Sequence, residues 1–379
     1  MKFNKKIVFL FFMLLLYLIL SNNFKNNEYF IDKKIKLFNI DLHISVIEDF
    51  ISINKLINSN IEVESNSISN HSYIMGKSRS DKYLTNNNWI DIINNKKKLN
   101  YFFQKNKKEL DKFEGFVITH TPSFILLYEK FNKPIIIINS CRYENPFMNN
   151  LKKWYELNNV IKKMFNKNLL IVVSNNKADQ QYLLMGTGIN SIHIPSLCLY
   201  TKAIYKNKKK KFVLFDRFNL IPDNKLFIKK ENLKKNYSWD ELYTYKGIIH
   251  IPYEISTMSI FEQYSANIPL FFPSKKFIKY LIKQNKIKLQ SKYSSIYLPE
   301  LEQSLGSDNY DFWIDNADFY DTNNMKHIQY FDSIEDLFNI LVLVNTNKIS
   351  ELMASHNKIR KKNVKMKWNN ILQNINFSK

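Results

Sequence analysis

Short apolar segments alternate with longer amphipathic segments along most of this chain. The apolar segments are bounded by Gly, Pro, Asn or Asp, which favour turns, so we interpret them as buried strands. Strands that are separated by single helices and short connections are typical of a mostly parallel sheet. We expect these strands at residues 115–118, 135–138, 169–173, 192–195, 212–215, 247–251 and 270–272.

The amphipathic segments predict helices at residues 97–113, 123–131, 154–165, 174–184, 239–246 and 275–285. Residues 36–47 predict a first strand, whereas residues 54–96 are rich in Asn and Ser and predict loops with one helix. We expect Ser333 to begin a late helix because acidic residues stand in its first turn, where the helix dipole favours them. Residues 349–371 predict one or two basic helices.

A basic segment divides the chain into two halves. Residues 200–211 include the run KNKKKK and lie between two strand signals, so they are the best linker candidate. At 379 residues, the chain is long enough for two domains with separate cores. We predict an α/β protein with Rossmann-like domains at residues 28–205 and 206–348. A signal-anchor and stem at residues 1–27 would precede them, and C-terminal helices at residues 349–379 would follow.

The N-terminus has a targeting pattern. Lys2, Lys5 and Lys6 precede an uninterrupted apolar run at residues 7–20, and a polar stretch follows at residues 21–27. This order predicts a single-pass signal-anchor, with a cytoplasmic N-terminus and the body in an endomembrane or Golgi-like lumen. A cleaved signal peptide is one alternative, because the run is shorter than the roughly 20 residues of a standard spanning helix. A buried strand or helix is the other.

The formal charge of +22 raises the question of a nucleic-acid partner. Asn and Lys are abundant and only 6 glycines occur, which suggests that many lysines reflect compositional bias on solvated surfaces. Neither zinc-finger spacing nor an aromatic RNA-binding motif is present, so we expect no nucleic-acid binding. We prefer a basic surface that faces anionic lipids or attracts a diphosphate. Cys141 and Cys198 form no metal or disulfide pattern.

The most informative stretch is residues 247–274, where a strand, a polar loop and a helix lead into the next strand. The loop lies at the C-terminal end of its strand, where open parallel sheets bind ligands. Glu254 and Glu262 stand eight positions apart across the helix start. This spacing resembles the E-x7-E pattern of nucleotide-sugar glycosyltransferases of the two-domain GT-B type. The segments THTPSFILLYEKFNKPIIIINS and SIFEQYSANIPLFFPS also resemble uncharacterised glycosyltransferase-like proteins of large DNA viruses and marine microbes.

The resemblance implies two Rossmann-like domains that face a cleft, with the C-terminal helices crossing back onto the first domain. It implies that Glu262 accepts both ribose hydroxyls of the donor; a surface glutamate on an Asn-capped helix is the alternative. Asn267 is expected to end this helix in the left-handed conformation, where Gly is usual. Glu254 would lie beside the transferred sugar as a catalytic residue, although the usual Gly and Phe between the two glutamates are absent.

Further donor-site residues are expected around the start of this helix. Ser256, Thr257 and Met258 occupy positions whose backbone N–H groups suit a diphosphate, although Ser256 also fits a simple N-cap. The remaining predicted nucleotide-sugar-binding residues are Arg217, Tyr245 and Tyr253. We expect Arg217 or Tyr245 to neutralise the leaving group in place of a metal.

Acceptor-site residues are expected at the strand ends of the first half. His120 follows a buried strand directly, so we expect it to face the cleft as a general base or an acceptor contact. A structural histidine is the alternative. The predicted acceptor-binding residues are Thr119, Thr121, Arg142, Tyr143 and Glu144. A salt bridge between Arg142 and Glu144 is the alternative to an acceptor contact.

The resemblance therefore implies a glycosyltransferase that moves a sugar from a nucleoside-diphosphate sugar to a glycan, protein or lipid acceptor. No Asp-x-Asp triplet of the metal-dependent, single-domain GT-A type occurs in a suitable place. We expect metal-independent transfer, with no metal site and no cofactor besides the donor substrate. The expected partners are the sugar nucleotide, a glycan, glycoprotein or glycolipid acceptor, and a membrane. A catalytically inactive, membrane-tethered protein that binds glycans or nucleotide sugars is the alternative.

Overall fold

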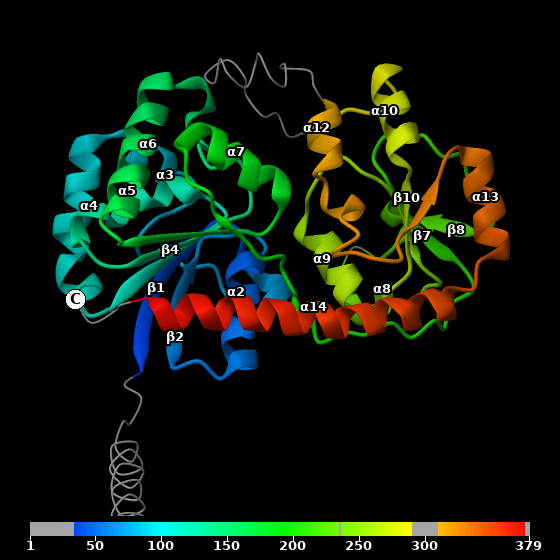
Figure 1. The fold of residues 1–379 in the computed structure, drawn as a ribbon, viewed down its shortest axis with the longest axis horizontal. Helices are drawn as coiled ribbons and strands as arrows, with labels where there is room; N and C mark the ends of the chain where they lie inside the picture. The colour runs from blue at the N-terminus through cyan, green and yellow to red at the C-terminus, as the bar shows by residue number, and fades with distance from the viewer. Residues whose placement is uncertain (1–33, 235, 290–309, 376–379) are drawn as a thin grey trace, which may run out of the picture.

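The structure is a computed structural model that describes residues 34–234, 236–289 and 310–375. The predicted anchor and stem at residues 1–27 lie outside these ranges. Within them, the chain forms two parallel sheets in two lobes joined along one side (Figure 1). This confirms the α/β class with two parallel sheets. In the same ranges, no helix combines the length and the apolarity that crossing a membrane requires.

The first sheet has six described strands in the order β2-β1-β3-β4-β5-β6, all paired in parallel. β3 and β4 are buried at every position, as central parallel strands covered by helices on both faces should be. The strands are β1 (Ile35–Asp41), β2 (Ile61–Ser67), β3 (Gly115–Thr119), β4 (Ile135–Asn139), β5 (Leu170–Ser174) and β6 (Ile192–His193). The helices around this sheet are α2 (Ile44–Ile57), α3 (Trp89–Asn94), α4 (Lys96–Leu110), α5 (Ile125–Tyr128), α6 (Leu151–Asn166) and α7 (Lys177–Thr187).

Two predictions for the first lobe were wrong. The predicted strand at residues 36–47 ends at Asp41, because Ile44, Ile47 and Phe50 recur at helical spacing and are buried on one face of α2. The second error concerns β2, which the sequence did not predict. β2 is an edge strand whose positions are mostly exposed or half-buried, so its sequence lacks the continuous apolar pattern of the central strands.

The second sheet has five described strands in the order β11-β10-β9-β7-β8. They are β7 (Phe212–Asp216), β8 (Phe227–Lys229), β9 (Ile248–Ile251), β10 (Leu270–Pro273) and β11 (Gln329–Phe331). The helices around this sheet are α8 (Trp239–Leu242), α9 (Met258–Ser265), α10 (Lys275–Lys283), α12 (Tyr310–Asp315) and α13 (Ile334–Leu343). Gly247 precedes β9 where a Cβ atom would lie 2.8 Å from the Pro269 carbonyl oxygen, so a larger residue would push β9 away from its neighbour.

The strand order changes direction once in each sheet. The chain passes from β1 to β2 on one side and then returns to β3 on the other side of β1. It likewise passes from β7 to β8 and returns to β9 on the other side of β7. Such switch points separate the loops that follow the two neighbouring strands and leave a crevice at their carboxyl ends. Each lobe therefore has one position at which a ligand site is expected.

A single long helix, α14 (Thr346–Asn374), spans both lobes (Figure 1). On the second lobe, Asn357 Nδ2 donates to Asn267 Oδ1 at 2.7 Å. Asn267 has the left-handed conformation that the sequence predicted, with φ of 63°. On the first lobe, Trp368 lies against Phe50 of α2, with ring centroids 5.0 Å apart. The helix thus connects the end of α9 to the first sheet.

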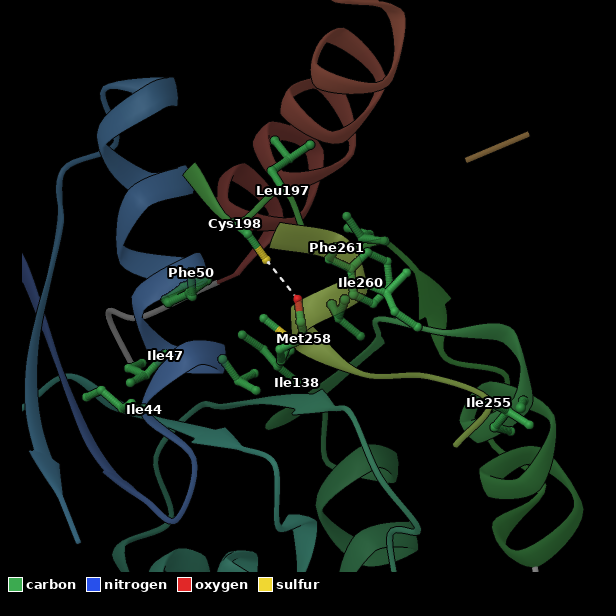
Figure 2. Close-up of a cluster of buried hydrophobic side chains, with 14 of the residues drawn as sticks. Ile44, Ile47, Phe50, Ile138, Leu197, Cys198, Ile255, Met258, Ile260 and Phe261 are labelled. Carbon is green, nitrogen blue, oxygen red and sulfur yellow. Dashed lines mark hydrogen bonds between the residues drawn. The ribbon is translucent and has the colours of Figure 1, made fainter. Parts of the chain in front are cut away.

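Apolar side chains also join the lobes directly, next to α14. Figure 2 shows Ile47 and Phe50 of α2 in the same cluster of buried side chains as Met258 and Phe261 of α9. These four side chains are buried and belong to one cluster that runs through both lobes. The Cys198 thiol also lies in this contact, 3.9 Å from the Met258 carbonyl oxygen. The two lobes are therefore packed against each other over a common core.

Candidate functional site

A pocket of about 410 Å³ opens at the carboxyl ends of β7 and β9, which is the switch point of the second sheet. Its volume falls within the range of about 300–1,000 Å³ that is usual for small-molecule sites. Its walls come from the segments after β7, β8 and β9 and from helices α8 and α9. The lining residues used below are Phe215, Asp216, Arg217, Lys230, Trp239, His250, Tyr253, Glu254, Thr257, Ser259, Glu262 and Gln263.

Two cations stand at this pocket. Arg217 directly follows β7, and its guanidinium carbon lies 3.5 Å from the centre of the Tyr253 ring. Lys230 directly follows β8, and its Nζ lies 5.0 Å from the centre of the Phe215 ring. The pKa of Lys230 is lowered, first by the loss of water around its ammonium group and then by the positive charge of Arg217. A bound anion near both groups would favour the charged form of Lys230 and would offset the repulsion between Lys230 and Arg217.

The position of Arg217 is fixed by its neighbour Asp216, the last residue of β7. Asp216 is buried, and its Oδ1 accepts a hydrogen bond from the backbone N–H of Phe218 at 3.0 Å. Its Oδ2 accepts another from the backbone N–H of Ile221 at 2.9 Å. Together these bonds close a tight loop after the strand. Arg217 is exposed at the start of this loop, where it can contact a ligand.

Glu262 lines the pocket, but other protein groups hold its carboxylate. Tyr200 Oη donates to Oε1 at 2.5 Å, and Trp239 Nε1 donates to Oε2 at 3.0 Å. Burial raises the pKa of Glu262 to about 7, while these two bonds partly oppose the shift. Each carboxylate oxygen has a second lone pair, so the predicted contact with ribose hydroxyls is still compatible with this arrangement.

A rigid aromatic stack supports the wall of the pocket. The His250 ring lies parallel to the Phe272 ring with centroids 4.7 Å apart, and Phe272 stacks on Phe319 at 4.5 Å. His250 Nε2 lies 2.7 Å from Gln263 Oε1. Burial lowers the pKa of His250 to about 4, so the ring is neutral at neutral pH. The stack therefore contributes shape rather than charge.

The structure separates the residues predicted around the donor into two groups. Arg217, Tyr253, Thr257 and Glu262, predicted to bind the nucleotide sugar, line the same pocket together with Glu254, which was predicted as catalytic. Thr257 Oγ1 also lies 3.0 Å from the Ser259 hydroxyl, which lines the pocket too. The sequence therefore grouped five residues that the fold does bring together.

The other three predicted residues are not among those that line the pocket. Ser256 forms a hydrogen bond with Asp318, whose pKa burial raises well above its usual value. Met258 belongs to the apolar contact between the lobes (Figure 2). Tyr245 is buried beneath Lys209, whose Nζ lies 4.0 Å from the ring centre. In this conformation these three residues stabilise the surrounding structure.

In the first lobe, His120 lies at the switch point between β1 and β3. Its ring centroid is 5.3 Å from that of His43, in an edge-to-face arrangement. Burial is the first cause, and the charges of His43 and Arg142 the second, of a pKa of His120 that is lowered to about 3. The imidazole is therefore neutral at neutral pH, and it is a weak base. Thr119 and Thr121 on either side are fully buried.

Tyr143 and Glu144 are buried in the first lobe, where they form internal hydrogen bonds. Trp154 Nε1 donates to Tyr143 Oη at 2.7 Å, and Tyr182 Oη donates to Glu144 Oε1 at 3.0 Å. Burial raises the pKa of Glu144 to about 7. An acceptor could not reach either side chain in this conformation. Arg142 is half-buried, and it is the predicted residue of this segment that a ligand could reach.

Several residues of the site were not predicted from the sequence. Lys230 was missed because it follows β8, a three-residue strand that the sequence did not reveal. Trp239 was recognised only as a helix start, and its indole contact with Glu262 spans 23 positions. The Tyr200 contact with the same carboxylate spans 62 positions, and no local pattern indicates it. Lys230 could have been found by treating every strand end as a candidate.

Residues 34–234, 236–289 and 310–375 contain no group of three or more His, Cys, Asp or Glu side chains that could hold a metal ion. A comparison with protein-family models and with curated proteins found no match to this chain. The functional assignment therefore depends on the geometry of the pocket.

Proposed function

We propose that this protein is a glycosyltransferase of the GT-B type that uses a nucleoside-diphosphate sugar as donor. The observation that carries the proposal is the pocket at the β7–β9 switch point, with Arg217 and Lys230 beside aromatic walls. A nucleoside diphosphate combines a flat ring with a compact double negative charge, and the pocket offers a partner for each part. In the proposed arrangement the two lobes face each other across the cleft that holds donor and acceptor.

The donor would bind with its diphosphate near Arg217 and Lys230. Arginine suits this role because its planar guanidinium binds phosphate oxygens in pairs, and Tyr253 already holds it by stacking. The hydroxyls of Thr257 and Ser259 lie on the same pocket wall and can donate to phosphate oxygens. Glu262 would accept from the ribose with its remaining lone pairs.

In the transfer step, an acceptor hydroxyl oxygen forms a bond to the anomeric carbon, and the bond from that carbon to the diphosphate oxygen breaks. The bonding electrons leave with the nucleoside diphosphate, whose growing charge Arg217 and Lys230 would stabilise. The acceptor proton passes to a base. Glu254 lines the pocket, so it is the better candidate for a catalytic residue near the sugar. His120 is a weak base because its pKa is lowered.

The same pocket in an inactive binding protein is the second candidate function. Two observations favour it. Protein donors already occupy both oxygens of Glu262, and the predicted base His120 is half-buried with a pKa lowered to about 3. Such a protein would bind a nucleotide sugar without turning it over. The predicted membrane anchor and lumenal location are compatible with both functions and remain proposals.

Turnover distinguishes the two functions. The full chain is incubated with UDP-, GDP-, ADP-, dTDP- and CMP-sugars, and released nucleotide is measured with and without simple sugar acceptors. We expect release from one donor, and we expect Arg217→Gln to reduce kcat/KM by about tenfold or more, since a charge-assisted contact to the leaving group is lost. Binding of a nucleotide sugar without any release would support the inactive binding protein. Neither binding nor release would contradict both.

A further inference from the structure

A second pocket, of about 420 Å³, lies where three parts of the molecule meet. Lys177 of α7 and His193 of β6 belong to the first lobe. Asn323 and Asn324 belong to the second lobe. Arg360 and Lys367 come from α14, the helix that spans both lobes. None of these residues lines the pocket at the β7–β9 switch point.

The walls of this inter-lobe pocket are strongly cationic. Lys177, Arg360 and Lys367 line it, together with His193 and three asparagines, and none of its lining residues is acidic. The carboxylate of Asp321 lies next to the pocket and forms an ion pair with Lys177, with Nζ 3.0 Å from Oδ1. Asp49 and Asp318 also interact with the charge of Arg360, but neither of them lines the pocket, so the lining of this recess between the lobes is cationic.

Arg360 places a buried positive charge beside this pocket. Its side chain is only 3 % exposed. Its two terminal nitrogens bond within the protein, since Nη1 donates to Ser265 Oγ at 3.0 Å and Nη2 donates to the Ser196 carbonyl oxygen. Its Nε–H has no partner, but it has almost no accessible surface, so a ligand in the pocket does not reach it. Because an arginine stays charged, Arg360 attracts an anion by its charge rather than by a direct hydrogen bond.

Two further groups face the same space. Lys367 Nζ donates to the His193 carbonyl oxygen at 2.9 Å, which fixes the ammonium at the pocket and leaves two of its N–H groups for other acceptors. His193 Nε2 is buried without a partner and has almost no accessible surface, so His193 contributes only part of the pocket wall. The amides of Asn323 and Asn324 add neutral donors.

We infer that this inter-lobe pocket binds a small phosphate-bearing anion. Lys367 holds it from α14 beside the charge of Arg360, Lys177 from the first lobe, and the asparagine amides from the second. A ligand held in this way stabilises the present arrangement of the lobes, because it contacts all three parts at once. Free inorganic phosphate and an organic phosphomonoester share this chemistry.

The test is calorimetric titration of the full chain with inorganic phosphate and with glycerol 3-phosphate, against sodium chloride at equal ionic strength. The expected result is saturable binding that Lys367→Gln weakens by about tenfold, the usual effect of losing one charge-assisted hydrogen bond. Lys367 is exposed, so this variant should fold. Lys177→Gln gives a second measurement on the first lobe. Tighter binding of glycerol 3-phosphate identifies a phosphomonoester as the ligand, and tighter binding of phosphate identifies the free ion.

One control variant separates this site from general attraction to a basic protein. Lys362→Gln removes an exposed cation of the same helix that does not line the pocket, and binding should be unchanged. The inference is overturned if phosphate binds no better than chloride, or if Lys367→Gln and Lys177→Gln bind it as tightly as the wild type.

Discussion

The Glu262 side chain lines the pocket and also accepts a hydrogen bond from Tyr200, at the start of the predicted linker at residues 200–211. Tyr200 holds one of its oxygens and Trp239 the other, and the two aromatic rings contact each other with centroids 5.8 Å apart. A buried carboxyl group needs such partners, because burial without them costs several kcal/mol. Glu262 therefore fixes the geometry of the pocket wall, whatever ligand the pocket binds.

Tyr200→Phe removes one of these donors and keeps the ring. We expect the free energy of unfolding to fall by about 1–3 kcal/mol, since a buried oxygen of Glu262 is left without its partner. Urea denaturation measures this change. Tyr280→Phe is the matched control, because Tyr280 is exposed and its hydroxyl should contribute little. Equal stability of the two variants would contradict the structural role of the Tyr200 bond.

The raised pKa of Glu144 predicts that the free energy of unfolding depends on pH. Burial raises its pKa from 4.5 to about 7, so the folded state keeps its proton over a range in which the unfolded state has lost it. The unfolded state then binds fewer protons, and stability must fall as pH rises from about 4.5 to about 7. Over this pH range, Glu144 lowers the free energy of unfolding by on the order of 3 kcal/mol.

Glu144→Gln should remove this part of the slope. Wild type and variant are compared by urea denaturation at pH 5 and pH 8. We expect the variant to lose less stability between the two values than the wild type does. Glu262 and Asp41 also have pKa values of about 7 and contribute to both slopes, so the difference between the proteins is the informative quantity. Identical pH profiles would show that Glu144 is not buried as described.

At the scale of elements, the unit from β9 through α9 to β10 determines the position of the pocket. α9 is short, and Asn267 in the left-handed conformation ends it and turns the chain back into the sheet. The same side chain accepts a bond from Asn357 of α14. One residue thus ends α9 and connects it to the helix that joins the lobes.

Substitution of Asn267 tests this double role. Asn267→Ala should lower the free energy of unfolding by about 1–2 kcal/mol, because a Cβ-bearing residue without a local hydrogen bond is strained at positive φ. Asn267→Gly loses the same side-chain bond but adopts this conformation easily, so it should retain more stability than Asn267→Ala. Thermal or urea denaturation measures both variants. If the alanine variant equals or exceeds the glycine variant, the conformational argument fails.

The sequence predicted elements best where they are buried on both faces or have clear boundaries. β3, β4 and β9 are continuous apolar runs followed by polar turns, and Ser333 caps its helix as expected by accepting from the backbone N–H of Asp336 at 3.0 Å. The edge strands β2 and β8 were missed because their exposed positions are polar or because the strand is very short.

The same limits apply to the candidate site. Arg217, Tyr253 and Glu254 could be predicted because they directly follow strands, and strand ends meet at one edge of a parallel sheet. The sequence does not show which side of α9 faces the pocket. Met258 was therefore predicted to contact the ligand, whereas it lies between the lobes (Figure 2). The Tyr200 contact with Glu262 depends on tertiary structure, which a local pattern does not contain.

At the scale of the whole molecule, α14 lies along both lobes (Figure 1), packs against both α2 and α9, and thereby holds the lobes together. Trp368→Ala should lower the free energy of unfolding by about 3–5 kcal/mol, since it leaves a cavity against Phe50. We expect the wild type to unfold in one calorimetric transition, and we expect the variant's transition to broaden or separate into two. Met366→Ala on the exposed face of α14 is the control and should change stability by less than about 0.5 kcal/mol. A Trp368→Ala protein as stable as the control would contradict this role of α14.

The central claim is that the pocket at the β7–β9 switch point binds a nucleoside diphosphate. The most direct measurement is calorimetric titration of the full chain with UDP, GDP, ADP and dTDP. Arg217→Gln is titrated beside the wild type. Lys211→Gln serves as the control, because Lys211 is an exposed cation that precedes β7 and does not line the pocket.

We predict that one nucleotide binds the wild type and the Lys211→Gln protein alike, and that Arg217→Gln binds it at least about tenfold more weakly. The account is contradicted if no nucleotide binds the folded protein, or if Arg217→Gln binds as tightly as the wild type.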